Sequence, residues 1–421
     1  MFCFCAVAIY PALYMNSRLS SLAYPQFRLY VAAQFVSQVG SFMQAAAQAW
    51  LVLTLFSEDK AEGILSLGVV TAMQFIPYLL LGLFAGALAD RMSRRRILFA
   101  TQIGLMLTAT LLGLAVSFNA VSVTLVAVIS FCTGLAYAFD LTARESLVAN
   151  LVSKETLSNA VALNSLAYNL GAVLGPALFG LLAPITGLST LFYLNAVSFL
   201  GLLWVLTKIS VPPLEKRPTS LLIDIREGLS YVWQVKSVRF TMLLLVIISL
   251  TLTNSRVIIP AFADVALGVD TRGFGLLGAA FSAGSICGAA WYAAQKRVSP
   301  AKFQSLSASL LAGAVLILAL TPNLLSASFA LGLAGAFAVV FKVSNESSIQ
   351  LSVPDALRGR VLSVYFFLGS GSAPFSSLLI AGAMSFLGVR QGLVLMAVLA
   401  LIAVGAWGTV RRTSAHTDGA S

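Results

Sequence analysis

Long apolar segments alternate with short polar segments along almost the whole chain. An apolar run of about 20 residues is long enough to cross a bilayer as a helix, and twelve such runs occur in the 421 residues. They cover roughly 29–55, 63–89, 97–117, 120–139, 160–183, 187–207, 240–263, 273–294, 301–321, 326–345, 361–385 and 390–410. The pattern predicts an all-α membrane protein with twelve transmembrane helices.

Only one connection between these runs is long, and it separates two groups of six helices. It holds Pro212, Pro213 and Pro218, followed by apolar residues at helical spacing, a pattern typical of an amphipathic helix on a membrane surface. Met15 is a second candidate start of the chain. We therefore expect a leader, a first half, a cytoplasmic linker, a second half and a polar cytoplasmic tail, at 1–27, 28–207, 208–239, 240–410 and 411–421.

Composition excludes a soluble globular domain, because 59% of the residues are hydrophobic and only 10% are charged. The net charge of +11 could suit nucleic acid, but the basic residues are scattered over short loops, so no nucleic-acid partner is expected. The four cysteines and the single histidine, His416, have no spacing typical of a metal site or a disulfide framework. No metal and no cofactor are expected.

The basic residues gather on one face of the twelve-helix arrangement. With both termini on that face, only Lys60, Arg272 and Arg390 fall on the other one, and Arg256 alone falls within a span. Short loops rich in lysine and arginine stay on the cytoplasmic side. The sequence predicts a multi-pass protein of a bacterial inner membrane with both termini in the cytoplasm.

The polar stretch between the second and third predicted helices has one acid among four arginines. Each charge there would cost roughly 2.5–3.5 kcal/mol in hydrocarbon, so the stretch marks a membrane face. Its pattern resembles the loop 2–3 signature of the major facilitator superfamily, with Ser93 where that family often has a second glycine. The matching residues are Gly86, Leu88, Asp90, Arg91, Arg94, Arg95 and Leu98. A plain positively charged anchor loop is the alternative.

This resemblance implies two six-helix halves that expose a central cavity alternately to the two sides of the membrane. It assigns a gating role to Gly86, Asp90, Arg91, Arg94 and Arg95. In the superfamily the aspartate is held near the start of the eleventh helix when the cytoplasmic side is closed. That start follows Arg358 and Arg360 in this sequence.

The fifth predicted helix carries Gly171, Gly175, Pro176 and Gly180. Glycines four residues apart allow a neighbouring backbone to approach closely, and a proline bends the helix because it removes a hydrogen bond. The segment resembles the antiporter motif of superfamily exporters. The alternative is a generic packing face of small residues.

Three further segments resemble one branch of the superfamily, the one that contains macrolide-efflux and enterobactin-exporter proteins. They are Phe27-Arg28 before the first helix, the stretch from Asp140 to Arg144, and the stretch from Pro354 to Val361. This resemblance names a branch and no substrate.

Polar side chains on the first and seventh helices are candidates for the substrate cavity. On the first helix, Gln34, Gln38, Ser41, Gln44 and Gln48 fall on one helical face. Amides need partners inside a membrane, so this face borders either a wet cavity or another helix.

On the seventh helix, Thr253 shares a face with Arg256, an intramembrane cation suited to an anionic or polar substrate. The alternative for Arg256 is extension toward the outer membrane surface and Asp264.

Asp140 and Glu346, near the cytoplasmic ends of the fourth and tenth predicted helices, are the candidates for proton coupling. Many antiporters have an arginine in the fourth helix, four residues before a glycine. Here Gly134 is kept but Ser130 takes the place of the arginine.

We expect a secondary active transporter that exports small amphipathic, drug-like or siderophore-like molecules by alternating access with proton antiport. An importer or a lipid transporter of the same fold is the alternative. An intramembrane enzyme would need paired aspartates, a Ser–His pair or a metal cluster at membrane depth, and the predicted spans supply none. The expected partners are a small-molecule substrate, protons and membrane lipids, and the expected state is a monomer.

Overall fold

The computed structural model describes residues 20–89, 93–209, 221–295 and 300–418. Within these ranges the backbone forms helices joined by short connections and contains no strand. The first half consists of η1 (Ser20–Ala23), α2 (Pro25–Thr54), α3 (Lys60–Ala89), α4 (Arg94–Ser117), α5 (Val123–Leu151) and α6 (Leu157–Lys208).

The second half contains two helices that are interrupted near mid-length. The seventh crossing breaks after Thr251 and resumes at Ser255, and the eleventh is interrupted at Ser372. The elements are α8 (Lys236–Thr251), α9 (Ser255–Ala261), η2 (Phe262–Ala266), α10 (Thr271–Ala293), α11 (Pro300–Leu320), α12 (Leu324–Ser352), α13 (Asp355–Gly371), α14 (Ala373–Leu387) and α15 (Val389–Asp418).

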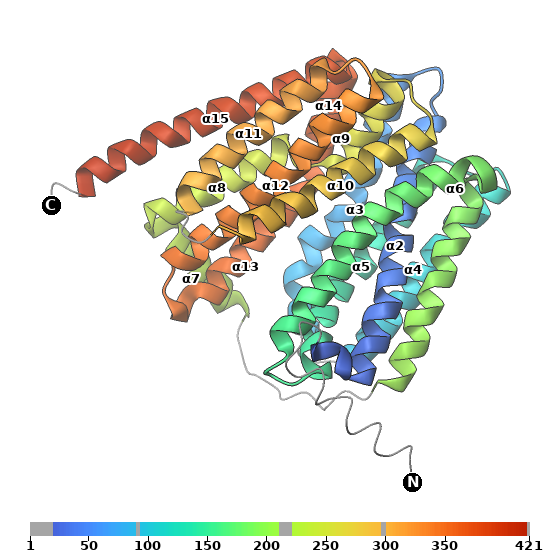
Figure 1. Ribbon diagram of the computed structural model, residues 1–421, viewed down its shortest axis with the longest axis horizontal. Helices are drawn as coiled ribbons and strands as arrows, with labels where there is room; N and C mark the ends of the chain where they lie inside the picture. Colours follow the sequence, from blue (N-terminus) through green and yellow to red (C-terminus); the bar gives the residue numbers. More distant parts are fainter. Residues whose placement is uncertain (1–19, 90–92, 210–220, 296–299, 419–421) are drawn as a thin grey trace, which may run out of the picture.

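The number of membrane crossings agrees with the sequence pattern. Ten helices in the described part of the chain are long and apolar enough to cross a membrane. The 52-residue α6 reverses direction (Figure 1) and so adds another crossing. The reversal lies at Gly187, whose φ of 77° is in the left-handed region that favours glycine. The 30-residue α2 is also long enough, although its glutamines make it more polar. The predicted fold class, twelve transmembrane helices in the major facilitator arrangement, is confirmed.

Corresponding helices in the two halves begin in the same way. The Ser122 hydroxyl accepts a hydrogen bond from the Leu125 N–H at the start of α5, and the Asn323 side chain accepts one from the Ser326 N–H at the start of α12. Each cap satisfies one of the N–H groups that the first turn of a helix leaves unpaired. The two halves thus share this helix cap as well as the number of helices.

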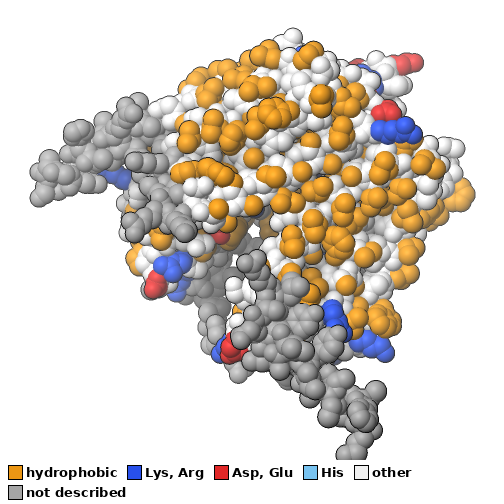
Figure 2. Space-filling view, viewed as in Figure 1, with side chains coloured by type: hydrophobic (Ala, Val, Ile, Leu, Met, Phe, Trp, Pro, Cys, Tyr) orange, Lys and Arg blue, Asp and Glu red, His pale blue; other side chains and the backbone are white. Residues whose placement is uncertain are grey.

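The two halves lie side by side in Figure 1, the first in blue to green and the second in yellow to red. We call the end of the bundle where α3 begins the Lys60 end, and the opposite end the α7 end. The ribbons of the two halves diverge toward the α7 end. Figure 2 shows hydrophobic side chains over the flank, with the described charged side chains near the ends. This distribution suits a protein whose flank contacts lipid.

The helix α7 (Leu221–Gln234) lies in the predicted linker and packs on the second half. Gly228 permits this close approach, since an added Cβ would lie 2.8 Å from the Arg360 carbonyl oxygen of α13. Glu227 forms an ion pair with Arg360, and the Tyr231 hydroxyl donates to the Ser352 carbonyl oxygen at 3.3 Å. The linker helix is therefore attached to the end of α12 and the start of α13, which the sequence predicts to lie on the cytoplasmic side.

The fourth and tenth helices are longer than predicted. The sequence places their ends near residues 139 and 345, whereas α5 continues to Leu151 and α12 to Ser352. Asp140 and Glu346 therefore lie near the ends of the predicted apolar spans, and the helices continue past them. Arg144 lies in the part of α5 beyond the predicted span and is only 5% exposed.

Candidate functional site

Two of the five polar side chains predicted on the first helix hold helices of the first half together. The Asn195 amide of α6 donates to the Gln44 side-chain oxygen at 2.7 Å, and the Gln48 amide donates to the Ser130 hydroxyl of α5 at 2.8 Å. Both glutamines are buried. The interhelical role that the sequence left open is thus the one that Gln44 and Gln48 have.

The other three members of this face differ in their surroundings. Gln34 is buried, and its side-chain oxygen has no hydrogen-bond partner in the described structure. Gln38 and Ser41 are half-buried. The part of the face nearer the α7 end is therefore the part with unused polar capacity.

The glycines of α6 pack against two different helices. Gly175 lies against α2, where an added Cβ would be 2.4 Å from the Phe42 Cβ, and Gly171 lies against Gln38. Further along, Gly180 faces α10 of the other half, and an added Cβ there would be 3.1 Å from the Gly275 Cα. Pro176 lies opposite Gly278. The predicted antiporter-like segment thus lies at a helix contact within the first half and at a contact between the halves.

Charged and aromatic side chains join the halves at the Lys60 end. Lys60 of α3 forms an ion pair with Asp264 of η2, at 2.8 Å, and we call this pair the Lys60–Asp264 bridge. The Trp50 ring of α2 stacks on the Phe274 ring of α10 with centroids 5.6 Å apart. Because Asp264 is engaged by Lys60, the alternative in which Arg256 extends toward Asp264 is not the observed arrangement.

Arg256 instead faces the first half near the break of the seventh crossing. Its Nη1 donates to the Gln74 side-chain oxygen of α3 at 3.1 Å, and its guanidinium carbon lies 5.6 Å from the centre of the Phe75 ring. A cavity of about 140 Å³ adjoins it, between the breaks of the seventh and eleventh crossings. Thr253, the other predicted cavity residue on this helix, lines the same cavity.

Asp140 forms a buried ion pair with Arg144, one helical turn further along α5. The Arg144 Nη2 and the Asp140 Oδ2 are 2.5 Å apart, and the side chains are only 6% and 4% exposed. The other carboxylate oxygen accepts hydrogen bonds from the Thr101 hydroxyl at 2.9 Å and the Gln102 amide at 2.6 Å, both on α4. Arg144 has no role of its own among the sequence predictions, although its spacing of four residues from Asp140 is the spacing of a helical ion pair.

Several buried polar atoms on α2, α4 and α5 have no hydrogen-bond partner among the described residues. They are Tyr30 Oη, Gln34 Oε1, Gln102 Oε1 and Arg144 Nη1. Almost all buried polar groups in proteins are hydrogen-bonded. This part of the first half can therefore form additional hydrogen bonds while it keeps the present ones.

Glu346 does not form such a pair. It is half-buried and accepts a hydrogen bond from the Gln350 amide at 3.1 Å on its own helix. Arg358 pairs with Asp355 at 2.5 Å, and Arg360 pairs with Glu227 of α7. The structure therefore does not bring Glu346 together with Asp140 in one site.

The predicted gating segment is only partly described. Asp90 and Arg91 lie outside the described residues, and Gly86 lies near the end of α3, where side-chain surroundings are also outside them. Arg94 begins α4, and Arg95 donates to the Thr207 carbonyl oxygen of α6 at 3.3 Å. The gating role stays a prediction.

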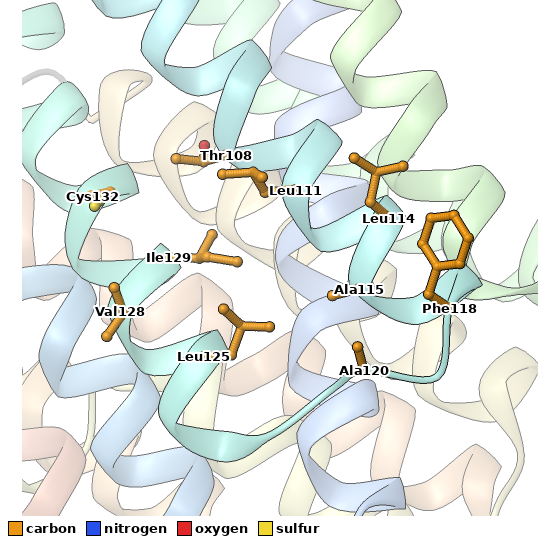
Figure 3. Close-up of a pocket in the computed structure, with 10 residues that line it drawn as sticks. All are labelled: Thr108, Leu111, Leu114, Ala115, Phe118, Ala120, Leu125, Val128, Ile129 and Cys132. Carbon is orange, nitrogen blue, oxygen red and sulfur yellow. The ribbon is translucent and has the colours of Figure 1, made fainter.

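An apolar groove lies between α4 and α5 near the Lys60 end (Figure 3). It measures about 400 Å³, and its labelled residues include Leu111, Phe118, Val128 and Cys132, all with exposed side chains. Thr108 brings the one hydroxyl to its wall. Among the described residues no cluster of histidine, cysteine or acidic side chains could hold a metal ion.

This combination of two repeated six-helix halves, an apolar flank and polar groups at their interface defines a membrane transporter. The family model of transmembrane secretion effectors matches residues 16–418. The chain belongs to that family, which is part of the major facilitator superfamily, so the resemblance inferred from loop 2–3 is confirmed.

Curated relatives match most of the chain. The Staphyloferrin A transporter of Staphylococcus aureus is 24% identical over 84% of this chain and 88% of its own length. The multidrug efflux pump Tap of Mycolicibacterium fortuitum is 26% identical over 83% and 87% of the respective lengths. These similarities make the chain a multi-pass membrane transporter of a secretion and efflux family.

Solved structures confirm the fold. A bacterial homologue of the human lysosomal transporter Spinster, in an inward-facing unoccupied conformation, has a TM-score of 0.72 at 15% identity and covers 92% of this chain and 98% of its own. A D-xylose–proton symporter has the same TM-score at 14% identity, covering 91% and 97%. At these identities the likeness concerns the fold alone.

Proposed function

We propose that this protein exports small amphipathic molecules across the bacterial inner membrane by alternating access, in exchange for protons. The α7 end and both termini face the cytoplasm in this proposal, and the Lys60 end faces outward. The name of one relative, a multidrug efflux pump, supports export over import. The working unit is a single chain surrounded by lipid.

The observation that carries the proposal is the position of the contacts between the halves. The Lys60–Asp264 bridge, the Trp50–Phe274 stack and the Gly180–Gly275 contact all lie toward the Lys60 end. The ribbons diverge toward the α7 end (Figure 1). Halves whose charged and aromatic contacts gather toward one end, while their ribbons diverge toward the other, have the arrangement that alternating access requires, with the substrate entering from the diverging end.

Asp140 is the residue that we propose carries the coupled proton. A proton on its carboxylate would remove the charge that balances Arg144, and a lone buried cation typically destabilises a protein by about 3–5 kcal/mol. Protonation must therefore be accompanied by a rearrangement of Arg144. The unpartnered atoms Tyr30 Oη and Gln34 Oε1 lie in the same region of the first half and offer new partners. A site whose two protonation states need two geometries can link proton binding to a change of conformation.

A transport assay in vesicles tests direction and coupling together. Inverted membrane vesicles that contain the protein, with an acidic lumen, should accumulate ethidium or the amphipathic acid 2-naphthoate, and dissipating the proton gradient should stop accumulation. Vesicles that contain Asp140→Asn should show no gradient-driven accumulation. Uptake into right-side-out vesicles, with none into inverted ones, would instead establish an importer.

A further inference from the structure

The cavity beside Arg256 is formed where two interrupted helices face each other. The break between α8 and α9 contributes Thr253, and the break between α13 and α14 contributes Ser372. The side chain of Asn254 fixes this arrangement, because its amide donates to the Ser377 hydroxyl of α14 at 2.8 Å. A direct contact between the two interrupted helices therefore borders the cavity.

Arg256 brings a positive charge to this cavity that no described acid balances. The acid nearest to it in sequence, Asp264, pairs with Lys60. Its one hydrogen bond in the described structure goes to the neutral Gln74 side chain. A guanidinium has five N–H donors in a planar fork that matches a carboxylate. A half-buried cation with donors to spare at membrane depth is suited to an anion that is not part of the chain.

A second, independent group points to the same kind of ligand. Ser376 of α14 lines the cavity and is only 1% exposed, and its hydroxyl has no hydrogen-bond partner in the described structure. A buried hydroxyl without a partner costs free energy, so it should have one during part of the transport cycle. A hydroxyl that can donate, beside an arginine, favours an oxygen anion.

We infer that this cavity binds the carboxylate, or a similar oxyanion, of the exported molecule. The inference rests on the proposed export function and adds to it the charge class of the substrate. Pockets that enclose a whole drug-sized ligand measure about 300–1,000 Å³, whereas this one has about 140 Å³. It therefore receives the charged end only, with the Phe75 ring beside it for an adjoining apolar group.

Binding can be measured without transport. The probes are 2-naphthoate and its neutral isostere 2-naphthamide, titrated into the purified full-length protein in detergent with calorimetric readout. The wild type should bind the acid at least about tenfold more tightly than the amide, because hydrogen bonds to a charged group are the stronger ones. Arg256→Gln should abolish this preference, and Ser376→Ala should weaken acid binding several-fold.

Two variants control for charge and folding. Arg272→Gln removes one arginine from an exposed position on α10 and should leave the preference unchanged. Arg256→Lys keeps the charge without the fork and should retain a reduced preference, which shows that the site is folded. Equal binding of acid and amide by the wild type, or an undiminished preference in Arg256→Gln, would overturn the inference.

The vesicle assay separates this inference from the proposed function. A wild type that prefers the acid but moves no compound into inverted vesicles would refute export and leave the anion site standing. A wild type that exports compounds without any preference for acids in the binding assay would refute the anion site alone.

Discussion

Breaking the Lys60–Asp264 bridge should shift the protein toward the state that is open at the Lys60 end. The bridge joins the first half to the second, so it exists only while that end is closed. Asp264→Asn removes the attraction and keeps the size of the side chain. Glu58→Gln is the matched control, because it removes an exposed acid from the adjoining loop.

The magnitude follows from the exposure of the two side chains. Lys60 is 39% exposed and Asp264 is 16% exposed, so the bridge is partly solvated. Exposed ion pairs contribute about 0.2–1 kcal/mol, and this pair belongs near the upper value because Asp264 is largely buried. A change of about 1 kcal/mol alters a two-state ratio about fivefold, since a factor of ten corresponds to about 1.4 kcal/mol.

Spin labels at Ser57 and Leu325 can report the ratio, because both positions are exposed at the Lys60 end and lie in different halves. The native cysteines are first replaced by serine. Double electron–electron resonance should show a ratio of the longer to the shorter distance that Asp264→Asn raises about fivefold and Glu58→Gln leaves unchanged.

The charge-swapped double variant decides whether the pair itself is responsible. Asp264→Lys should open the Lys60 end further than Asp264→Asn, because two cations then face each other. Adding Lys60→Asp restores opposite charges and should return the distance distribution close to that of the wild type. Additive effects of the two reversals would refute a direct role for the bridge.

Three further predictions concern other parts of the molecule. Gly175→Leu should abolish transport and lower stability by about 1–3 kcal/mol through overpacking. Gly201→Leu on the same helix, where no atom lies within 4 Å of an added Cβ, should change neither transport nor stability. Thermal melting measures stability, and the vesicle assay measures transport. Asp140→Asn should lower the melting temperature because Arg144 is left as a lone buried cation, and the double variant Asp140→Asn/Arg144→Gln should recover part of that loss; full stability in the single variant would contradict the pairing. Asp90→Asn should slow turnover with normal yield, measured in the same vesicles, and unchanged turnover would reduce Asp90 to an ordinary loop residue.

The helices can be predicted from sequence because each one corresponds to a long run of apolar residues. A span of about 20 apolar residues is unambiguous, and the bias of lysine and arginine toward one face predicts the orientation of the spans. The reversal at Gly187 is predicted as a boundary between two spans for the same reason. Interruptions such as the one between Thr251 and Ser255 are not, because the broken segment stays apolar enough to cross the membrane.

Partners between helices can be predicted less well than the polar residues themselves. The spacing of Gln44 and Gln48 shows that they share a face, but their partners, Asn195 and Ser130, belong to helices distant in the sequence. The same holds for Arg256, whose contact with Gln74 crosses the interface between the halves. A single sequence shows that a buried polar residue needs a partner, but it does not show which residue that partner is.

The end of the fourth helix illustrates a physical reason for a wrong boundary. A charged residue in an apolar segment normally marks the membrane surface, since an isolated charge is costly in hydrocarbon, and the sequence pattern places Asp140 at a helix end on that ground. The cost falls when an opposite charge lies one turn away, and Arg144 satisfies that condition at 2.5 Å within the same helix. The remaining carboxylate oxygen accepts hydrogen bonds from two further donors, Thr101 and Gln102. Opposite charges four residues apart near the end of an apolar segment should therefore be interpreted as an ion pair within one helix that continues past the predicted boundary.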